Sequence, residues 1–160
     1  ILLILLMEMG FIYAQNIWRV IKMEELIILK EPNSIKEPTQ IFKNIQKIRI
    51  DYKQENLILF VLNTTNEIIF KEILFKGGLN SCIVDLRTLL RKVLLKNGNA
   101  FIIAHNHPSG NLNPSGEDIK IYEKLKEVSK ILTIEVLDSI IFNKTHFYSL
   151  NNERKPFEVV

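Results

Sequence analysis

One continuous apolar run constrains the fold of this chain more than any other feature. Residues Asn56 to Asn63 read NLILFVLN, which combines β-branched and aromatic side chains and carries no charge. Such a run is typical of a strand that is buried on both faces. The polar turn at residues 64–66 follows, and Glu67 to Phe75 is predicted to return as the partner strand of a hairpin. The chain must therefore provide cover for both faces of a sheet.

Helical and strand patterns alternate after this hairpin. Apolar residues recur at helical spacing from Asp85 to Leu95, which predicts an amphipathic helix. Ala100 to Ala104 is predicted to be a short apolar strand, and a second helix is expected from Gly116 to about Ile131. Residues 134–137 and 140–142 are predicted to form a strand or a strand pair. This alternation predicts an α/β domain with a largely buried sheet.

The length of 160 residues suits one compact domain, and 47% hydrophobic residues are enough for a core. Residues 1–38 are interpreted as an N-terminal extension whose last part, Glu31 to Gln40, is a proline-containing linker. The domain is expected to occupy residues 39–150, beginning with a helix from Gln40 to Lys47 capped by Thr39. Residues 151–160 are interpreted as a C-terminal tail.

The first residues of the chain and its single cysteine indicate the cellular compartment that we expect. Ile1 to Met7 is apolar but far shorter than the roughly 20 residues that span a bilayer. It also lacks the basic flank and cleavage site of a signal peptide. Cys82 is the only cysteine, so no intramolecular disulfide forms and any metal site must use His, Asp and Glu. We therefore expect a cytoplasmic protein with no membrane association.

The net charge of +3 does not by itself indicate nucleic-acid binding, because the basic residues are spread along the chain. Two predicted helices carry basic clusters, which are Arg87, Arg91, Lys92 and Lys96 on the first, and Lys120, Lys124 and Lys126 on the second. These clusters are typical of the solvated faces of amphipathic helices, and no aromatic residues interleave them. We expect at most weak, non-specific affinity for nucleic acid.

His105, His107 and Asp118 are candidate metal ligands. Residues i and i+2 of a strand point to the same side, so the two imidazoles can aim at one point. The intervening Pro and Gly residues allow a tight loop that brings Asp118, on the first turn of the next helix, back toward the strand end. Two imidazoles and a carboxylate are a common catalytic zinc set that leaves a fourth position for water, and zinc lowers the pKa of that water to about 7.

Hydrolysis at such a site also needs a proton carrier and a donor to the developing oxyanion. Glu55, just before the buried strand, is the candidate for the carrier, and Glu72 is the competing acid. Ser115 is the candidate donor, although a Ser three residues before an Asp is also an ordinary helix-capping pattern. His146 lies in a polar stretch and is interpreted as a surface residue.

The segment HNHPSGNLNPSGED, from His105 to Asp118, resembles the RadC-like branch of the JAB/MPN (JAMM) metalloprotease superfamily. Its pattern of His-x-His, seven residues, Ser, two residues and Asp is complete in this chain. The stretches FVLNTTNEII, FKGGLNSCIV and DLRTLLRKVLLKNGNAFIIAHNHPSG are also similar, so the resemblance covers roughly Tyr52 to Leu150. One departure is Asp138-Ser139, where the family usually has a histidine.

The resemblance implies a JAB/MPN (cytidine deaminase-like) α/β sandwich with a mixed sheet flanked by helices. It further implies that His105, His107 and Asp118 bind Zn2+, that Glu55 is the general acid/base, and that Ser115 steadies the tetrahedral intermediate. The expected activity is zinc-dependent cleavage of peptide or isopeptide bonds in an unknown protein or peptide substrate. Two alternatives stay open, which are a DNA repair or mobile-element accessory protein acting on or near DNA, and a pseudo-enzyme used as a protein-binding module.

Overall fold

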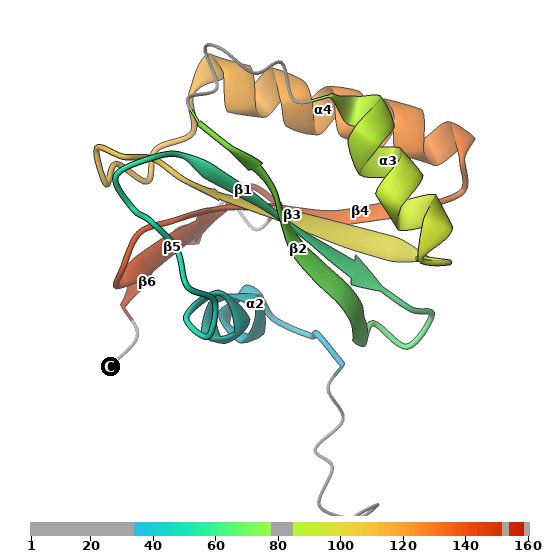
Figure 1. The fold of residues 1–160 in the computed structure, drawn as a ribbon, viewed down its shortest axis with the longest axis horizontal. Coiled ribbons are helices and arrows are strands. Elements are labelled where there is room, and N and C mark those ends of the chain that lie inside the picture. The colour runs from blue at the N-terminus through green and yellow to red at the C-terminus, as the bar shows by residue number, and fades with distance from the viewer. Residues whose placement is uncertain (1–33, 78–84, 152–153, 159–160) are drawn as a thin grey trace, which may run out of the picture. The chain divides into compact units, whose positions relative to one another are not determined.

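Six strands form one mixed sheet in the order β2-β1-β3-β4-β5-β6 (Figure 1). The computed structural model describes residues 34–77, 85–151 and 154–158. The strands are β1 Asn56–Leu62, β2 Ile68–Lys76, β3 Ala100–Asn106, β4 Glu135–Phe142, β5 His146–Ser149 and β6 Arg154–Glu158, and the helices are α2 Pro38–Ile45, α3 Leu86–Leu95 and α4 Gly116–Ile131. Residues 1–33, which hold most of the predicted N-terminal extension, and Cys82 lie outside the described residues.

The pairing of the strands makes the sheet mixed. β1 lies antiparallel between β2 and β3, whereas β3 and β4 run parallel and are joined through α4. β4, β5 and β6 continue the sheet in antiparallel pairs. The expected α/β fold with a mixed sheet flanked by helices is thereby confirmed.

Both faces of β1 are covered, as its apolar sequence predicted. Ile58, Phe60 and Leu62 belong to the core between the sheet and α2. The alternate residues Leu57, Leu59 and Val61 belong to the core beneath α3 and α4. Figure 1 shows the same three layers, with α3 and α4 over one face and α2 over the other. All seven residues of β1 are buried because neither face meets solvent.

The first described helix begins earlier than the sequence predicted. The expected helix from Gln40 to Lys47 with a Thr39 cap is instead α2, which starts at Pro38 and ends at Ile45. Glu37 is its N-cap, and a capping box joins Glu37 and Gln40. Proline suits the first helical turn because the amide hydrogen that it lacks has no partner there anyway, and this is why the helix begins at Pro38.

The polar pair Asp138-Ser139 does not interrupt β4, which is one continuous strand. Asp138 is buried and accepts hydrogen bonds from the Ser149 hydroxyl at 2.6 Å and from the Ser139 amide at 2.7 Å. Burial raises the pKa of Asp138 from its ordinary value, and these hydrogen bonds oppose that shift. The segment interpreted as a C-terminal tail contains β6, which pairs with β5 at the sheet edge. Among the described residues, no helix is long and apolar enough to cross a membrane.

Candidate metal centre

His105 and His107 lie at the end of β3, where the strand gives way to a loop. β3 extends two residues further than the sequence predicted, so His105 is its penultimate residue and His107 follows its last one. The odd-numbered residues Phe101 and Ile103 of this strand face α3 and α4. By the same alternation both imidazoles point to that side, and their Nε2 atoms are 3.1 Å apart.

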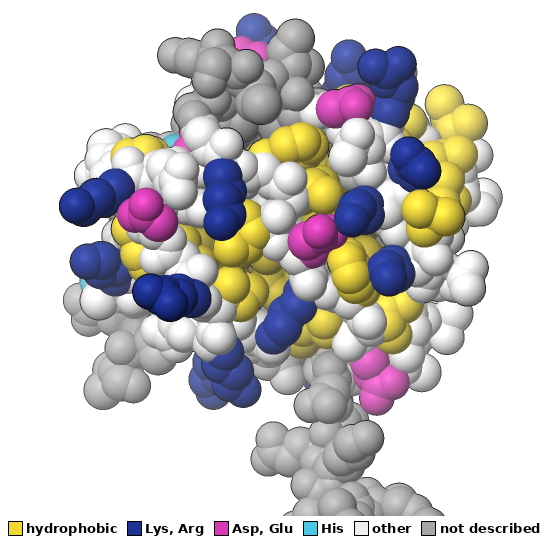
Figure 2. Space-filling view, viewed as in Figure 1, with side chains coloured by type: hydrophobic (Ala, Val, Ile, Leu, Met, Phe, Trp, Pro, Cys, Tyr) yellow, Lys and Arg dark blue, Asp and Glu magenta, His cyan; other side chains and the backbone are white. Residues whose placement is uncertain are grey.

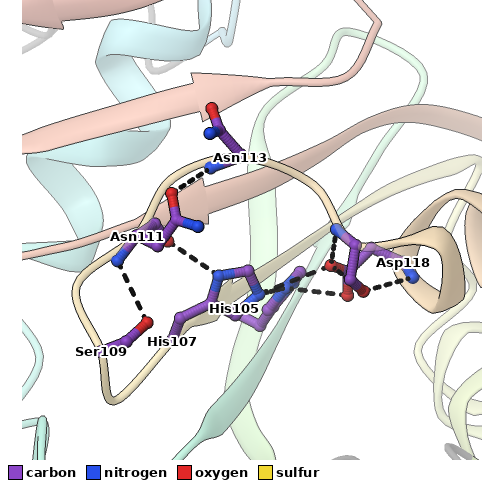
Figure 3. A network of polar contacts seen from close by, with 7 residues as sticks. His105, His107, Ser109, Asn111, Asn113 and Asp118 are labelled. Carbon is purple, nitrogen blue, oxygen red and sulfur yellow. Dashed lines mark hydrogen bonds and ion pairs between the residues drawn. The ribbon is translucent and has the colours of Figure 1, made fainter.

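Asp118 approaches the two histidines from the first turn of α4 (Figure 3). Its Oδ1 lies 3.1 Å from His105 Nε2, and its Oδ2 lies 3.4 Å from His107 Nε2. The Asp118 side chain is 2% exposed and the His105 side chain is 4% exposed. The structure therefore brings together the three predicted ligand side chains, which come from two elements joined by one loop.

That loop also fixes the tautomer of His107. The Nδ1 atom of His107 lies 2.7 Å from the carbonyl oxygen of Asn111. A carbonyl only accepts hydrogen bonds, so Nδ1 carries the hydrogen and the neutral ring presents its Nε2 lone pair to the site. The loop is braced in turn by Asn143, whose side-chain amide donates to the Gly110 carbonyl at 3.2 Å. Gly110 has a φ of +74°, a conformation that glycine adopts without strain.

These atoms fit a divalent metal ion. With bonds of about 2.0–2.1 Å, ligand atoms around tetrahedral zinc are separated by about 3.3 Å. The observed separations of 3.1, 3.1 and 3.4 Å match that spacing. Two imidazole lone pairs and a carboxylate would repel one another at this distance unless a metal ion lay among them or one Nε2 atom carried a hydrogen. The donor set is therefore a candidate metal site.

The pKa shifts of His107 and Asp118 also indicate that positive charge is favoured at the site. The hydrogen bond to Asp118 raises the pKa of His107, burial opposes this, and the Asn111 carbonyl and the charges of Asp118 and Glu55 add to the rise. Burial alone would raise the pKa of Asp118, but its hydrogen bonds with His105 and His107 outweigh burial and hold that pKa well below its usual range. A cation is thus favoured among these groups.

Glu55, the residue just before β1, joins the same cluster. β1 and β3 pair with Leu57 opposite His105, so continuing this antiparallel register places Glu55 opposite His107. A carboxylate oxygen of Glu55 lies within 4.8 Å of a ring nitrogen of each histidine, and the residue is buried. The competing acid Glu72 lies on β2, where its Oε2 atom forms an ion pair with Lys92 Nζ at 2.8 Å. Of the two acids, only Glu55 lies at the candidate site.

A buried pair of asparagines holds the strand segment that carries Glu55. Asn106 Oδ1 accepts from the backbone amide of Asn56 at 3.0 Å and from its side-chain amide at 2.9 Å. The Asn106 amide donates to the Gln54 carbonyl at 2.9 Å. Asn106 thus forms hydrogen bonds with the residues on both sides of Glu55. This role of Asn106 was not predicted from the sequence, although an asparagine between two histidines of a strand must point to the opposite face.

Ser115 is the N-cap of α4 and holds the Asp118 carboxylate. Its hydroxyl donates to Asp118 Oδ2 at 2.6 Å and accepts from the Asp118 amide at 3.1 Å. The Ser115 backbone amide donates to the same Oδ2 at 2.7 Å. The capping arrangement weighed from the sequence is therefore present, and in it the single hydroxyl hydrogen is directed at Asp118. The predicted role of Ser115 at an oxyanion stays a prediction.

The remaining residues singled out from the sequence have local partners. His146 is half-buried at the start of β5, where its ring nitrogen contacts the Thr145 hydroxyl at 2.7 Å. In the predicted basic clusters, Lys96 lies over the Phe70 ring and Lys126 over the Tyr122 ring. Figure 2 shows the Lys and Arg side chains of one face in separate spots with hydrophobic side chains between them. Among the described residues, no ion pair joins those cations to the side chains of the candidate metal centre.

Known proteins are similar to this chain over most of its length. A model of the RadC-like JAB domain matches residues 35–155. A UPF0758 protein of Clostridium perfringens is 38% identical over 138 residues, covering 86% of this chain and 59% of the relative. A UPF0758 protein of Staphylococcus aureus is 40% identical over 122 residues, covering 75% and 56%. One of Flavobacterium johnsoniae is 34% identical over 144 residues, covering 90% and 62%. The chain thus spans about three fifths of the length of these relatives.

Proposed function

The chain belongs to the RadC-like JAB domain family, and on that premise we propose that it is a zinc-dependent hydrolase that cleaves peptide or isopeptide bonds. The observation that carries the proposal is the convergence of His105 Nε2, His107 Nε2 and the Asp118 carboxylate within 3.1 to 3.4 Å. In this proposal those three side chains hold the metal. Zinc, when bound, would supply the activation of a water molecule for attack on a carbonyl carbon.

The chain's own residues would divide the remaining work. Glu55, buried beside both histidines, would accept the proton of the attacking water and return it to the leaving amine. Asn106 would keep Glu55 in reach of that water by holding residues 54 and 56. Ser115 would hold Asp118 in the orientation in which one oxygen faces each histidine. The Asn111 carbonyl would keep the His107 Nε2 lone pair turned toward the metal.

The metal content of the purified protein tests the premise of this proposal. We expect about one zinc per chain by elemental mass spectrometry, as catalytic zinc sites hold. His107→Ala should lose most of it, whereas His146→Ala, a histidine outside the cluster, should retain it. Cleavage of a peptide library should vanish on chelation and return with zinc. Wild-type protein that takes up no zinc would end the proposal.

The DNA alternative is an outcome of the same set of assays. In a nuclease assay beside the peptide assay, we expect no zinc-dependent cutting of duplex or single-stranded DNA. DNA cutting that disappears in His107→Ala, with no peptide cleavage, would assign this centre to nucleic acid instead. The basic residues of α3 and α4 do not favour that assignment, since Lys96 lies over the Phe70 ring, Lys126 lies over the Tyr122 ring and Lys92 pairs with Glu72.

A further inference from the structure

A groove of about 420 Å³ opens beside the candidate metal centre. Three segments line it, which are residues 52–53 before β1, residues 107–110 of the ligand loop, and residues 143–145 of the turn between β4 and β5. His107 is part of its wall, so the groove and the candidate metal centre share one side chain. Its volume falls in the range of about 300–1,000 Å³ that is usual for sites of small ligands.

The walls of the groove are held in place by contacts between these segments. Asn143 donates to the Gly110 carbonyl at 3.2 Å and so joins the turn to the ligand loop. The Tyr52 ring packs edge-on against Phe142, with 6.3 Å between the ring centroids and 85° between the planes. The Lys144 ammonium lies 5.7 Å from the Tyr52 centroid. These contacts therefore hold the lining of the groove in a defined arrangement.

The charge of the groove has one sign. Lys53 and Lys144 both line it, and its lining contains no Asp or Glu. Both lysines are exposed, and no ion pair of either is found among the described residues. Two acids, Asp51 and Glu55, lie two residues from Lys53. Asp51 accepts hydrogen bonds from the Lys53 backbone amide and the Gln54 side chain, and Glu55 is buried beside the histidines of the candidate metal centre. The lining away from the candidate metal centre thus carries two cations and no carboxylate, which complements an anionic group.

We propose that this groove binds an acidic side chain of a peptide substrate, placed beside the bond that is cleaved. The position of that bond rests on the proposed function, because it requires the reacting carbonyl to lie at His107. Consecutive residues of a peptide are only about 3.8 Å apart at Cα, so a chain held at His107 has a neighbouring residue within reach of the adjoining groove. A glutamate or aspartate there would meet Lys53 and Lys144.

A peptide suits this groove better than a nucleic acid does. Nucleic-acid binding rests on many phosphate contacts along a charged track, and this groove offers two cations. Bases stack on open aromatic faces, whereas Lys144 lies over the Tyr52 ring. The groove is also short and adjoins a single metal ligand. These features match one acidic side chain rather than a strand of phosphates.

Binding by the full zinc-loaded chain tests the proposal without requiring cleavage. Fluorescence anisotropy would compare labelled peptides that differ only in one Glu, Gln or Lys. A single exposed ion pair contributes about 0.2–1 kcal/mol, and the Glu side chain would meet two lysines. Because about 1.4 kcal/mol corresponds to a tenfold change, we expect roughly two- to thirtyfold tighter binding of the Glu peptide than of the Gln peptide. The double variant Lys53→Glu/Lys144→Glu should reverse the order and favour the Lys peptide. Lys43→Glu/Lys47→Glu, which makes the same change of net charge at exposed positions of α2 and just beyond it, should keep the Glu preference.

The possible results separate the groove from the metal chemistry. Equal binding of the Glu and Gln peptides, or an unchanged preference in Lys53→Glu/Lys144→Glu, overturns the proposal. Displacement of the Glu peptide by a DNA oligonucleotide at physiological salt, lost in that variant, also overturns it and assigns the groove to nucleic acid. Charge-dependent peptide binding without any cleavage supports the proposed binding of an acidic side chain in the groove and contradicts the proposed hydrolase activity. Cleavage that does not depend on acidic residues in the peptide supports the proposed hydrolase activity and contradicts the proposed role of the groove.

Discussion

The middle of the β1–β3 pair and its polar end are built from the same two strands in one continuous register, yet they serve different purposes. In the middle, Phe60 pairs with Ile102, and both are buried in the apolar layer next to α2. At the end, Leu57 pairs with His105, and Glu55 and Asn56 then lie beside His107 and Asn106. Burial of the apolar stretch stabilises the fold. This stabilisation offsets the cost of holding the charged and polar groups close together at the other end.

The difference shows what the polar end requires. Burying an ionisable group costs free energy unless a partner compensates it. At the candidate site, Asp118 is compensated by two histidines and by Ser115, and Asn106 is paired with Asn56 and Gln54. Stability and site geometry should therefore be separable by mutation, since different residues of the same strands carry them.

Phe60→Ala should give the largest loss of stability. Truncating a fully buried phenylalanine removes apolar contacts and leaves a cavity, which costs about 3–5 kcal/mol of unfolding free energy. Denaturant unfolding would measure this, and zinc content measured well below the melting temperature should remain at the wild-type level. Phe60→Leu should recover part of the loss. Loss of zinc from Phe60→Ala while it is still folded would show that the two regions are not separable.

Glu55→Gln should affect the polar end alone. The amide keeps the shape of the side chain but cannot accept the proton, so turnover should fall by roughly 10²-fold or more. Zinc content should persist, because Glu55 is proposed as the proton carrier and not as a ligand. Glu72→Gln is the matched control and should cleave normally, since Glu72 pairs with Lys92 on β2. Zinc loss in Glu55→Gln would instead make Glu55 a ligand.

Asn106→Leu should disturb both regions. The Asn56 amide loses its acceptor, and an unsatisfied buried donor costs about 1–3 kcal/mol. If Asn106 positions Glu55, kcat should fall by more than in Phe60→Ala, which supplies the stability control, while KM and zinc content change little. Asn106→Asp keeps the acceptor and should restore part of kcat. Equal activities of Asn106→Leu and Phe60→Ala would reduce Asn106 to a structural residue.

The effect of pH on zinc binding should be the smallest. The raised pKa of His107 means that the metal-free folded protein holds a proton more tightly than the unfolded chain. That stabilisation is fully present below the ordinary value of 6.5 and is lost as pH rises through the folded-state pKa. Zinc must displace this proton, so the zinc-induced rise in stability should weaken below the folded-state pKa, by about 1.4 kcal/mol per pH unit for one proton. Melting curves with and without zinc across this range would measure it, and a pH-independent zinc effect would contradict it.

Much of the candidate site could be predicted because its ligands lie close together in the chain. His105 and His107 share a side through the two-residue period of a strand, and Ser115 and Asp118 are three apart at a helix start. The groove could not be predicted in this way. Its lining comes from three segments that are separated by more than thirty residues each, and only the sheet order brings β1, β3 and β4 side by side.

By itself, the sequence determined the buried strands, the helix that follows the ligand loop and the spacing of the candidate ligands, because each depends on residues that lie close together in the chain. The sequence favoured Glu55 over Glu72 through the family resemblance, and only the tertiary structure decided which residues hold Glu55 in place. Glu55 reaches His107, and Glu72 does not, because of the antiparallel register between β1 and β3. Asn106 finds Asn56 fifty residues away for the same reason. Contacts across such a distance depend on strand pairing, and no local pattern specifies which strands become neighbours.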